Sequence, residues 1–106
     1  MNTASVKVVV IDERRVDYAT GDAFLAQLET AVGDGGRAAI VDLSRVARIG
    51  TVGLRALIET AKRSHAFFAV VAPQPGLREL LTIGRVDAIV PVFASVDDAR
   101  SAVPEA

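Results

Sequence analysis

Short apolar runs alternate with amphipathic stretches along the whole chain. Three of these runs are strand-length and rich in β-branched or aromatic residues, which predicts buried strands. They are Val6–Ile11, Arg37–Leu43 and Phe67–Val71. A fourth run, Ala88–Phe93, also predicts a strand, and its Pro91 indicates a place at the edge of a sheet.

Between the runs, apolar residues recur at the spacing of helices. The four predicted helices are those that stop at Gly33–Gly36, begin near Val52, end at Gly84 and open at Ser95, which is the expected N-cap. Strands that alternate with helices indicate an α/β domain with a mostly parallel sheet. We therefore expect a single domain over residues 1–106, with four to five strands and about four helices, and with residues 1–5 and 104–106 flexible.

The most informative stretch joins the second strand to the second helix. Ala38–Ser44 predicts a buried strand and the turn after it, and Ile49–Leu54 predicts a turn that leads into a helix. Unpaired N–H groups at such a helix start lie at an exposed corner, where we expect the functional site. Thr51 carries the hydroxyl of this segment, and we expect it to be the N-cap, with its oxygen on the N–H of Gly53 or Leu54.

This stretch resembles the STAS domain of bacterial anti-sigma factor antagonists. The family pattern is a hydrophobic strand, Asp-Leu-Ser, a few residues and then Asp-Ser-Ser-Gly-Leu, and the matching positions here are Asp42–Ser44 and Gly50–Leu54. The passages Pro73–Asp87 and Phe93–Ala99 also resemble the family, so the likeness extends over nearly the whole chain from Val6 onward. The resemblance implies a STAS-like fold and a protein-binding switch with no catalysis and no cofactor of its own.

In that family, the antagonist docks on an anti-sigma factor of the histidine-kinase ATPase fold and frees the sigma factor held there. The same partner is a serine kinase, and it ejects the antagonist by phosphorylating the second serine of the pair. That serine is replaced here by Val52, and the preceding aspartate is replaced by Gly50. Phosphorylation at the usual position is therefore expected to be lost. Either the protein binds constitutively, which we favour, or Thr51 has become the phospho-acceptor.

The resemblance names the residues of the switch, which are Asp17, Gly50, Thr51, Val52, Gly53, Leu54 and Arg55. Asp17 matches an aspartate that approaches this corner in the family. It is expected either to contact the partner or position a phosphate, or to form a surface turn. Arg45, Arg48 and Arg55 either form a basic rim for an acidic partner surface or are solvated charges. The second interpretation is favoured, with Arg55–Glu59 and Glu59–Arg63 as helical ion pairs.

Some neighbouring residues are assigned structural roles. Asp42 and Ser44 are expected to hold the turn after the strand. Tyr18 and Phe24 are expected to pack where the first helix begins, although an exposed Tyr18 would suit an interface as an aromatic anchor. His65, the only histidine of the sequence, is expected to be structural or exposed.

Only five residues precede Val6, so the short extra strand that the family commonly has before this position is expected to be truncated or missing. If this leaves a sheet edge uncovered, Val6–Ile11 could pair with a second copy in a weak homodimer.

Composition narrows the classes of function further. The net charge of −1 gives no general attraction for nucleic acid, and the absence of cysteine excludes disulfides and thiolate metal sites. No apolar run approaches the roughly 20 residues of a membrane helix, so we expect a cytoplasmic protein without membrane insertion.

Two other functions are compatible with parts of the chain. A STAS subunit of a lipid-transport ATP-binding-cassette complex carries a similar helix start, which Thr51–Leu54 matches with Thr51 as the contact residue, but the aspartate that usually precedes it is absent. An enzyme is disfavoured, because the sequence has no nucleophile–base pair, phosphate-binding glycine loop or metal cluster.

Overall fold

The computed structural model describes residues 6–33 and 36–104. Its centre is a four-stranded sheet in the order β1-β3-β5-β6, and every pair of neighbouring strands is parallel. The strands are β1 (Val6–Val10), β3 (Ala38–Asp42), β5 (Phe67–Val71) and β6 (Val92–Phe93). The predicted α/β fold with a parallel sheet is confirmed.

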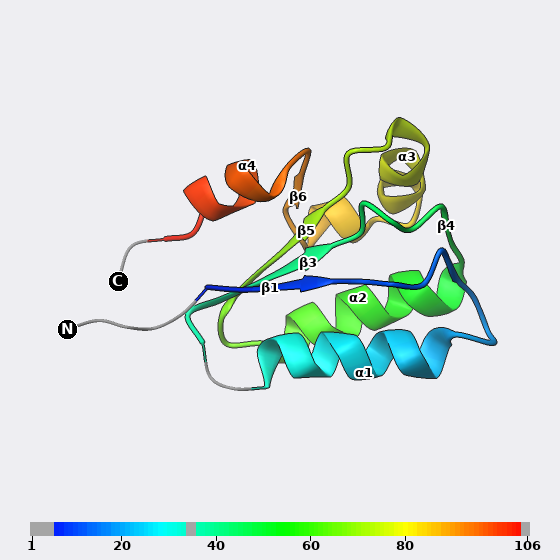
Figure 1. The fold of residues 1–106 in the computed structure, drawn as a ribbon, viewed down its shortest axis with the longest axis horizontal. Coiled ribbons are helices and arrows are strands. Elements are labelled where there is room, and N and C mark those ends of the chain that lie inside the picture. Colours follow the sequence, from blue (N-terminus) through cyan, green and yellow to red (C-terminus); the bar gives the residue numbers. More distant parts are fainter. Residues whose placement is uncertain (1–5, 34–35, 105–106) are drawn as a thin grey trace.

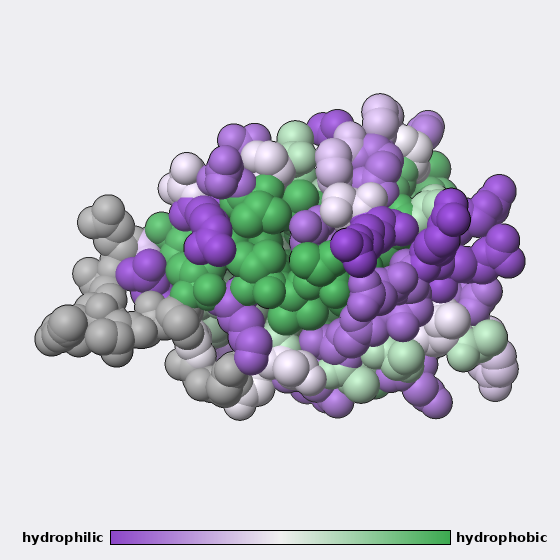
Figure 2. Space-filling view, in the orientation of Figure 1, coloured by the Kyte–Doolittle hydropathy of each residue, from purple (hydrophilic) through white to green (hydrophobic). Residues whose placement is uncertain are grey.

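Four helices flank the sheet (Figure 1). They are α1 (Gly21–Val32), α2 (Thr51–Arg63), α3 (Pro75–Ile83) and α4 (Val96–Ser101). The first two lie side by side on one face of the sheet, and α4 covers the other face over β3, β5 and β6. Because α4 does not reach across β1, apolar side chains remain visible over this part of the face (Figure 2).

The two faces of β3 explain how the core is divided. Ala39 and Val41 point toward α1 and α2, where they join a large apolar cluster that includes Phe24, Leu28 and Leu57. Ile40 points to the opposite face and packs in a smaller cluster under α4. A strand with both faces covered is apolar at every position, as the sequence from Ala38 to Val41 is.

The predicted strand Ala88–Phe93 is mostly wrong. Only Val92–Phe93 pairs with β5, and Val86–Ala88 forms a 3₁₀ helix. Val86 and Val90 are both fully buried and lie one helical turn apart, and the N–H of Val90 donates to the carbonyl of Val86 at 2.7 Å. Burial at this spacing favours a helical turn over an extended strand. The expected edge position is correct, because β6 is the last strand of the sheet.

A second, two-stranded sheet was not expected from the sequence. It consists of β2 (Arg15–Val16) and β4 (Arg48–Ile49), which run parallel. It lies past one end of the main sheet, and α2 begins at the same end (Figure 1).

Three expectations concern residues that the structure does not describe. The truncated strand before Val6, the flexible ends at 1–5 and 105–106, and part of the Gly33–Gly36 stop lie outside the described residues, although α1 does end at Val32. Among the described residues, no helix combines the length and apolar character that crossing a membrane requires.

Candidate functional site

The small sheet brings two distant segments together at the N-terminus of α2. Arg15 lies opposite Arg48 and Val16 lies opposite Ile49 in its register. The pairing continues for one residue, because the N–H of Gly50 donates to the carbonyl of Val16 at 2.8 Å. The chain then turns directly into α2. We call residues 15–17 and 48–52, which this sheet joins, the switch corner.

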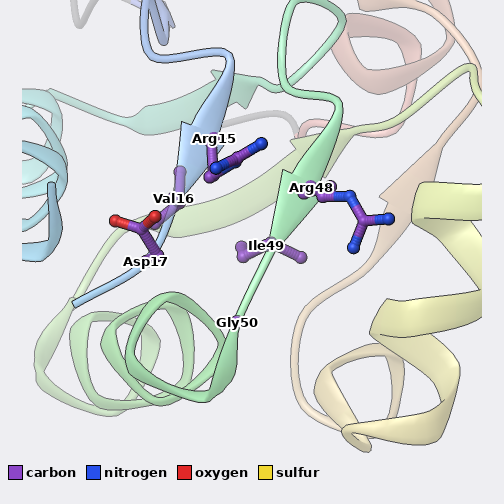
Figure 3. A pocket seen from close by; sticks show the side chains of 6 residues that line it. All are labelled: Arg15, Val16, Asp17, Arg48, Ile49 and Gly50. Carbon is purple, nitrogen blue, oxygen red and sulfur yellow. The ribbon is translucent and has the colours of Figure 1, made fainter. Parts of the chain in front are cut away.

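The switch corner contains a shallow pocket of about 420 Å³ between the two segments (Figure 3). Backbone of Gly50 and the side chains of both short strands form its wall. The lining residues are Arg15, Val16, Asp17, Arg48, Ile49 and Gly50. Of the residues that the sequence assigned to the switch, the pocket therefore includes Asp17 and Gly50.

Gly50, and not Thr51, is the N-cap of α2. Gly50 has extended backbone angles (φ −96°, ψ −175°), whereas Thr51 is already the first helical residue. The first helical hydrogen bond runs from the N–H of Leu54 to the carbonyl of Gly50 at 3.0 Å. The expected capping bond of Thr51 is therefore wrong, because Thr51 lies one residue beyond the N-cap position.

The start of α2 consequently has no side-chain cap and no acidic residue in its first turn. The first N–H groups of a helix carry a partial positive charge and have no partner within the helix. Thr51 is exposed, and its hydroxyl makes no hydrogen bond to any other described residue. The corner thus presents unpaired donors and one free hydroxyl to the surface.

Val52 occupies the second position of the helix and is 40% exposed. Its inner side packs on Gly21, the first residue of α1. A β-carbon built on Gly21 would lie 2.6 Å from Cγ1 of Val52. Val52 therefore has a packing role between the two helices in addition to facing the surface.

Gly53 is buried where α2 crosses the small sheet. A β-carbon there would lie 2.6 Å from Cγ1 of Ile49 and 2.7 Å from Cγ1 of Val16. These distances are shorter than carbon atoms tolerate, so only glycine permits this close approach. Gly53, directly after the switch corner, thus lets the backbone of α2 lie against β2 and β4.

Leu54 and Arg55 face a groove between α2 and α3. A β-carbon on Gly84, which caps the end of α3, would lie 2.7 Å from Cδ1 of Leu54. Leu54, Arg55 and Thr51 line this groove together with the 71%-exposed Ile83. The groove thus continues from the switch corner along α2.

Asp17 forms a turn. Its Oδ1 accepts hydrogen bonds from the N–H groups of Ala19 at 3.0 Å and Thr20 at 3.2 Å. In Figure 3, its carboxylate lies on one side of β2, and the side chains of Arg15 and Arg48 lie on the other. The geometry supports the surface-turn interpretation of Asp17. Asp42 holds the turn after β3 in the same way, by accepting from the N–H of Ser44 at 2.9 Å.

The same turn carries Tyr18, which is 91% exposed. The expectation that Tyr18 and Phe24 both pack where α1 begins is correct for Phe24, which is buried, and wrong for Tyr18. The Asp17 turn points the aromatic ring away from the core and next to the switch corner. His65 is exposed, in agreement with one of the two roles expected for it.

The expected helical ion pairs of Arg55 and Glu59 are also wrong. Arg63 pairs instead with Glu29 of α1 at 3.8 Å, and Arg45 pairs with Asp12 at 2.8 Å. Arg48 and Arg55 have no ion pair with any described residue. Of the three arginines considered for a basic rim, Arg45 is thus neutralised, while the other two remain available.

Comparisons with known proteins agree with this architecture. A family model of the STAS domain matches residues 3–99. The crystal structure of an anti-sigma factor antagonist from Mycobacterium paratuberculosis is similar, with a TM-score of 0.87 and 30% sequence identity over 99% of this chain and 91% of that chain.

Two more distant structures share the fold. A candidate anti-sigma factor antagonist from Thermotoga maritima has a TM-score of 0.75 and 22% identity, over 91% of this chain and 86% of that chain. The murine anion transporter of the Solute Carrier 26 family has a TM-score of 0.76 and 19% identity, over 95% of this chain but only 18% of that chain. A search of curated proteins found no match. The family model and the antagonist structure both extend over most of the sequence, and the chain therefore belongs to the STAS domain family.

Proposed function

We propose that this chain is an anti-sigma factor antagonist that docks on its anti-sigma factor through the switch corner. The main support is the similarity to the Mycobacterium paratuberculosis antagonist over nearly the full length of both chains. Further support comes from the corner itself, where α2 starts without a side-chain cap and Thr51 has a hydroxyl that is free within the described part of the chain. The exposed Tyr18 follows β2, and the pairing of β2 with β4 brings this distant segment to the start of α2.

The proposed partner is an anti-sigma factor of the histidine-kinase ATPase fold that also acts as a serine kinase. Docking of the antagonist frees the sigma factor, so the sigma factor is affected only indirectly. In this proposal the chain is not an enzyme and has no cofactor, any nucleotide is bound by the partner, and the complex forms in the cytoplasm without nucleic acid or membrane contact.

Binding is proposed to be insensitive to phosphorylation at the position that the family uses. Val52 stands there, in the first turn of α2, and a valine has no hydroxyl that could accept phosphate. In a serine-bearing antagonist, a phosphate would add up to about two negative charges at the centre of the contact. The favoured form of the proposal is therefore a constitutive antagonist, and the other form has Thr51 as the acceptor.

Affinity capture from the native cells tests the proposal. The tagged chain is recovered, the co-purified proteins are identified by mass spectrometry, and Thr51 is checked for phosphate. A matched variant, Val52→Asp, places a carboxylate in the first turn of α2 as a mimic of the phosphorylated state. We expect the wild-type chain, but not this variant, to recover a histidine-kinase-type ATPase.

The alternative, a STAS subunit of a lipid-transport complex, predicts a different result from the same experiment. It predicts recovery of transporter ATPase and permease subunits, with Thr51 as a contact residue. That outcome would contradict the antagonist proposal.

A further inference from the structure

Two arginines occupy paired positions on the two strands of the small sheet. Arg15 of β2 and Arg48 of β4 are register partners, and both are exposed. Arg14 precedes them in the chain, and its carbonyl accepts from the N–H of Ala47 at 2.6 Å and of Arg48 at 3.3 Å. The backbone pairing therefore holds the two arginines on neighbouring strands, and both line the shallow pocket. Hydrophilic side chains dominate this end of the molecule (Figure 2).

The carboxylates near this arginine pair are engaged elsewhere. Asp12 binds Arg45, and Glu13 accepts a hydrogen bond from Gln27. The carboxylate of Asp17 caps its own turn and is directed to the other side of β2 (Figure 3). Neither Arg15 nor Arg48 has an ion pair or a side-chain hydrogen bond within the described residues.

Two positive charges on neighbouring strands lower the stability of the free protein. Like charges directly opposite each other on neighbouring strands are destabilising, whereas opposite charges there are favourable. The packing of Val16 and Ile49 in the core holds the two strands together in spite of this repulsion. The pair is thus unfavourable in the free chain but becomes favourable when a negative group is placed between or beside the two guanidiniums.

We propose that Arg15 and Arg48 form a carboxylate-binding site for an acidic surface segment of the protein partner. This inference rests on the proposed function, because it assigns the chemistry of the partner surface that meets the switch corner. A guanidinium binds a carboxylate through two parallel hydrogen bonds, which fixes orientation as well as adding affinity. The uncapped start of α2 adds partial positive charge at the other side of Gly50.

A protein partner fits this surface better than nucleic acid does. The pair is confined to one corner of a chain with a net charge of −1, so that there is no extended basic track for a phosphate backbone. The neighbouring Tyr18, which is 91% exposed, supplies the type of aromatic anchor that protein interfaces use. We therefore expect the partner to present Asp or Glu residues around an apolar recess.

The test uses charge reversal, which acts in opposite directions on stability and on binding. Arg48→Glu places a carboxylate opposite Arg15, and we expect a higher urea midpoint for the free chain. The affinity for the anti-sigma factor recovered by the capture experiment should fall by about tenfold to a hundredfold at 50 mM salt. Arg15→Ala is a second variant, for which we expect about a tenfold loss of affinity and a weaker dependence on salt.

Arg100→Glu is the matched control, because it changes the net charge equally on α4, at the opposite face of the sheet. We expect it to leave the affinity within about twofold of wild type, since exposed charges this far from an interface are largely screened. If wild type binds the anti-sigma factor and Arg48→Glu binds equally well, the arginine inference is overturned while the proposed function stands. If wild type itself binds no anti-sigma factor, the proposed function fails, and the inference fails with it.

Discussion

Gly21 at the start of α1 and Val52 in the first turn of α2 are in direct contact, and there is no room for a further methyl group between them. A β-carbon on Gly21 would lie 2.6 Å from Cγ1 of Val52. Val52, which is proposed to stand at the phospho-acceptor position of the family, therefore also packs between the two helices. Its β-branched side chain has one strongly preferred rotamer in a helix, so it cannot easily turn away.

This contact is tested by Gly21→Ala. Overpacking costs about 1–3 kcal/mol, while replacing glycine in a helix recovers about 0.5–1 kcal/mol. We expect a net loss of about 1 kcal/mol in the free energy of unfolding, measured by urea denaturation. When Val52→Ala is also present, Gly21→Ala should cost little additional stability. A double-mutant cycle would then give a coupling energy about equal to the loss seen in the single Gly21 variant.

Gly76→Ala is the matched control, because a β-carbon there meets no atom within 4 Å and the residue also lies in the first turn of a helix. We expect it to be neutral or slightly stabilising. Equal stability of the Gly21 and Gly76 variants would show that Val52 does not constrain α1.

Gly53→Ala is expected to be more damaging. Its β-carbon would lie within 3.0 Å of atoms of Ile49 and Val16, which are both buried in the small sheet. The side chains cannot yield toward solvent, so we expect a loss of about 2–3 kcal/mol in the free energy of unfolding. A loss below about 0.5 kcal/mol would mean that α2 does not need its close approach to β2 and β4.

Two hydroxyl residues at helix starts should respond differently to removal of the hydroxyl. The side chain of Ser95 accepts from the N–H of Asp98 at 3.0 Å, so Ser95→Ala should cost about 1 kcal/mol. Thr51 is not the N-cap and makes no such bond, so Thr51→Ala should change stability by less than about 0.5 kcal/mol. Thermal unfolding of both variants checks the assignment, and an equal cost for the two would contradict it.

The restoration of phosphorylation is a separate expectation. Gly50 has room for a side chain, because its β-carbon would meet only the carbonyl oxygen of Val16 at an ordinary contact distance of 3.6 Å. We expect the double variant Gly50→Asp, Val52→Ser to accept phosphate at position 52 from the partner kinase, detected by mass spectrometry.

A double variant with Gly50→Asp and Val52→Ala has no hydroxyl at that position and serves as the negative control. The expectation fails if the hydroxyl-bearing variant remains unmodified while the same kinase phosphorylates a serine-bearing antagonist.

The parts of the fold that the sequence predicted well are those with long periodic signals. The apolar run of β3 and the recurrent apolar positions of α1 each bury several side chains. β3 was found close to its predicted bounds, and α1 ends where its stop was predicted. Ser95 was assigned correctly as an N-cap, because it lies between an edge strand and two acidic residues that favour a helix start.

The short elements of the switch corner carry no such signal. A strand of two residues, such as β2 or β4, has no periodicity, and it exists here because the two segments pair with each other. That pairing also explains the error at Thr51, since the hydrogen bond from Gly50 to Val16 keeps Gly50 extended and starts the helix at the next residue. Glycine and threonine are both acceptable N-caps, so the sequence alone left the choice open.

The arginines near the switch corner also could not be sorted from the sequence alone. Arg15 and Arg48, which form the proposed carboxylate-binding site, lie far apart in the sequence, and the register of the small sheet brings them together. Arg45, by contrast, resembled Arg48 in the sequence, but Asp12 neutralises it.

The most direct test of the central claim is a titration of the recovered anti-sigma factor with the wild-type chain, before and after incubation with ATP and magnesium. A serine-bearing antagonist in parallel verifies that the kinase is active by losing affinity. A constitutive antagonist should bind with unchanged affinity in both conditions and carry no phosphate on Thr51. Loss of affinity after incubation, with phosphate on Thr51, would contradict constitutive binding, and no binding in either condition would contradict the antagonist function itself.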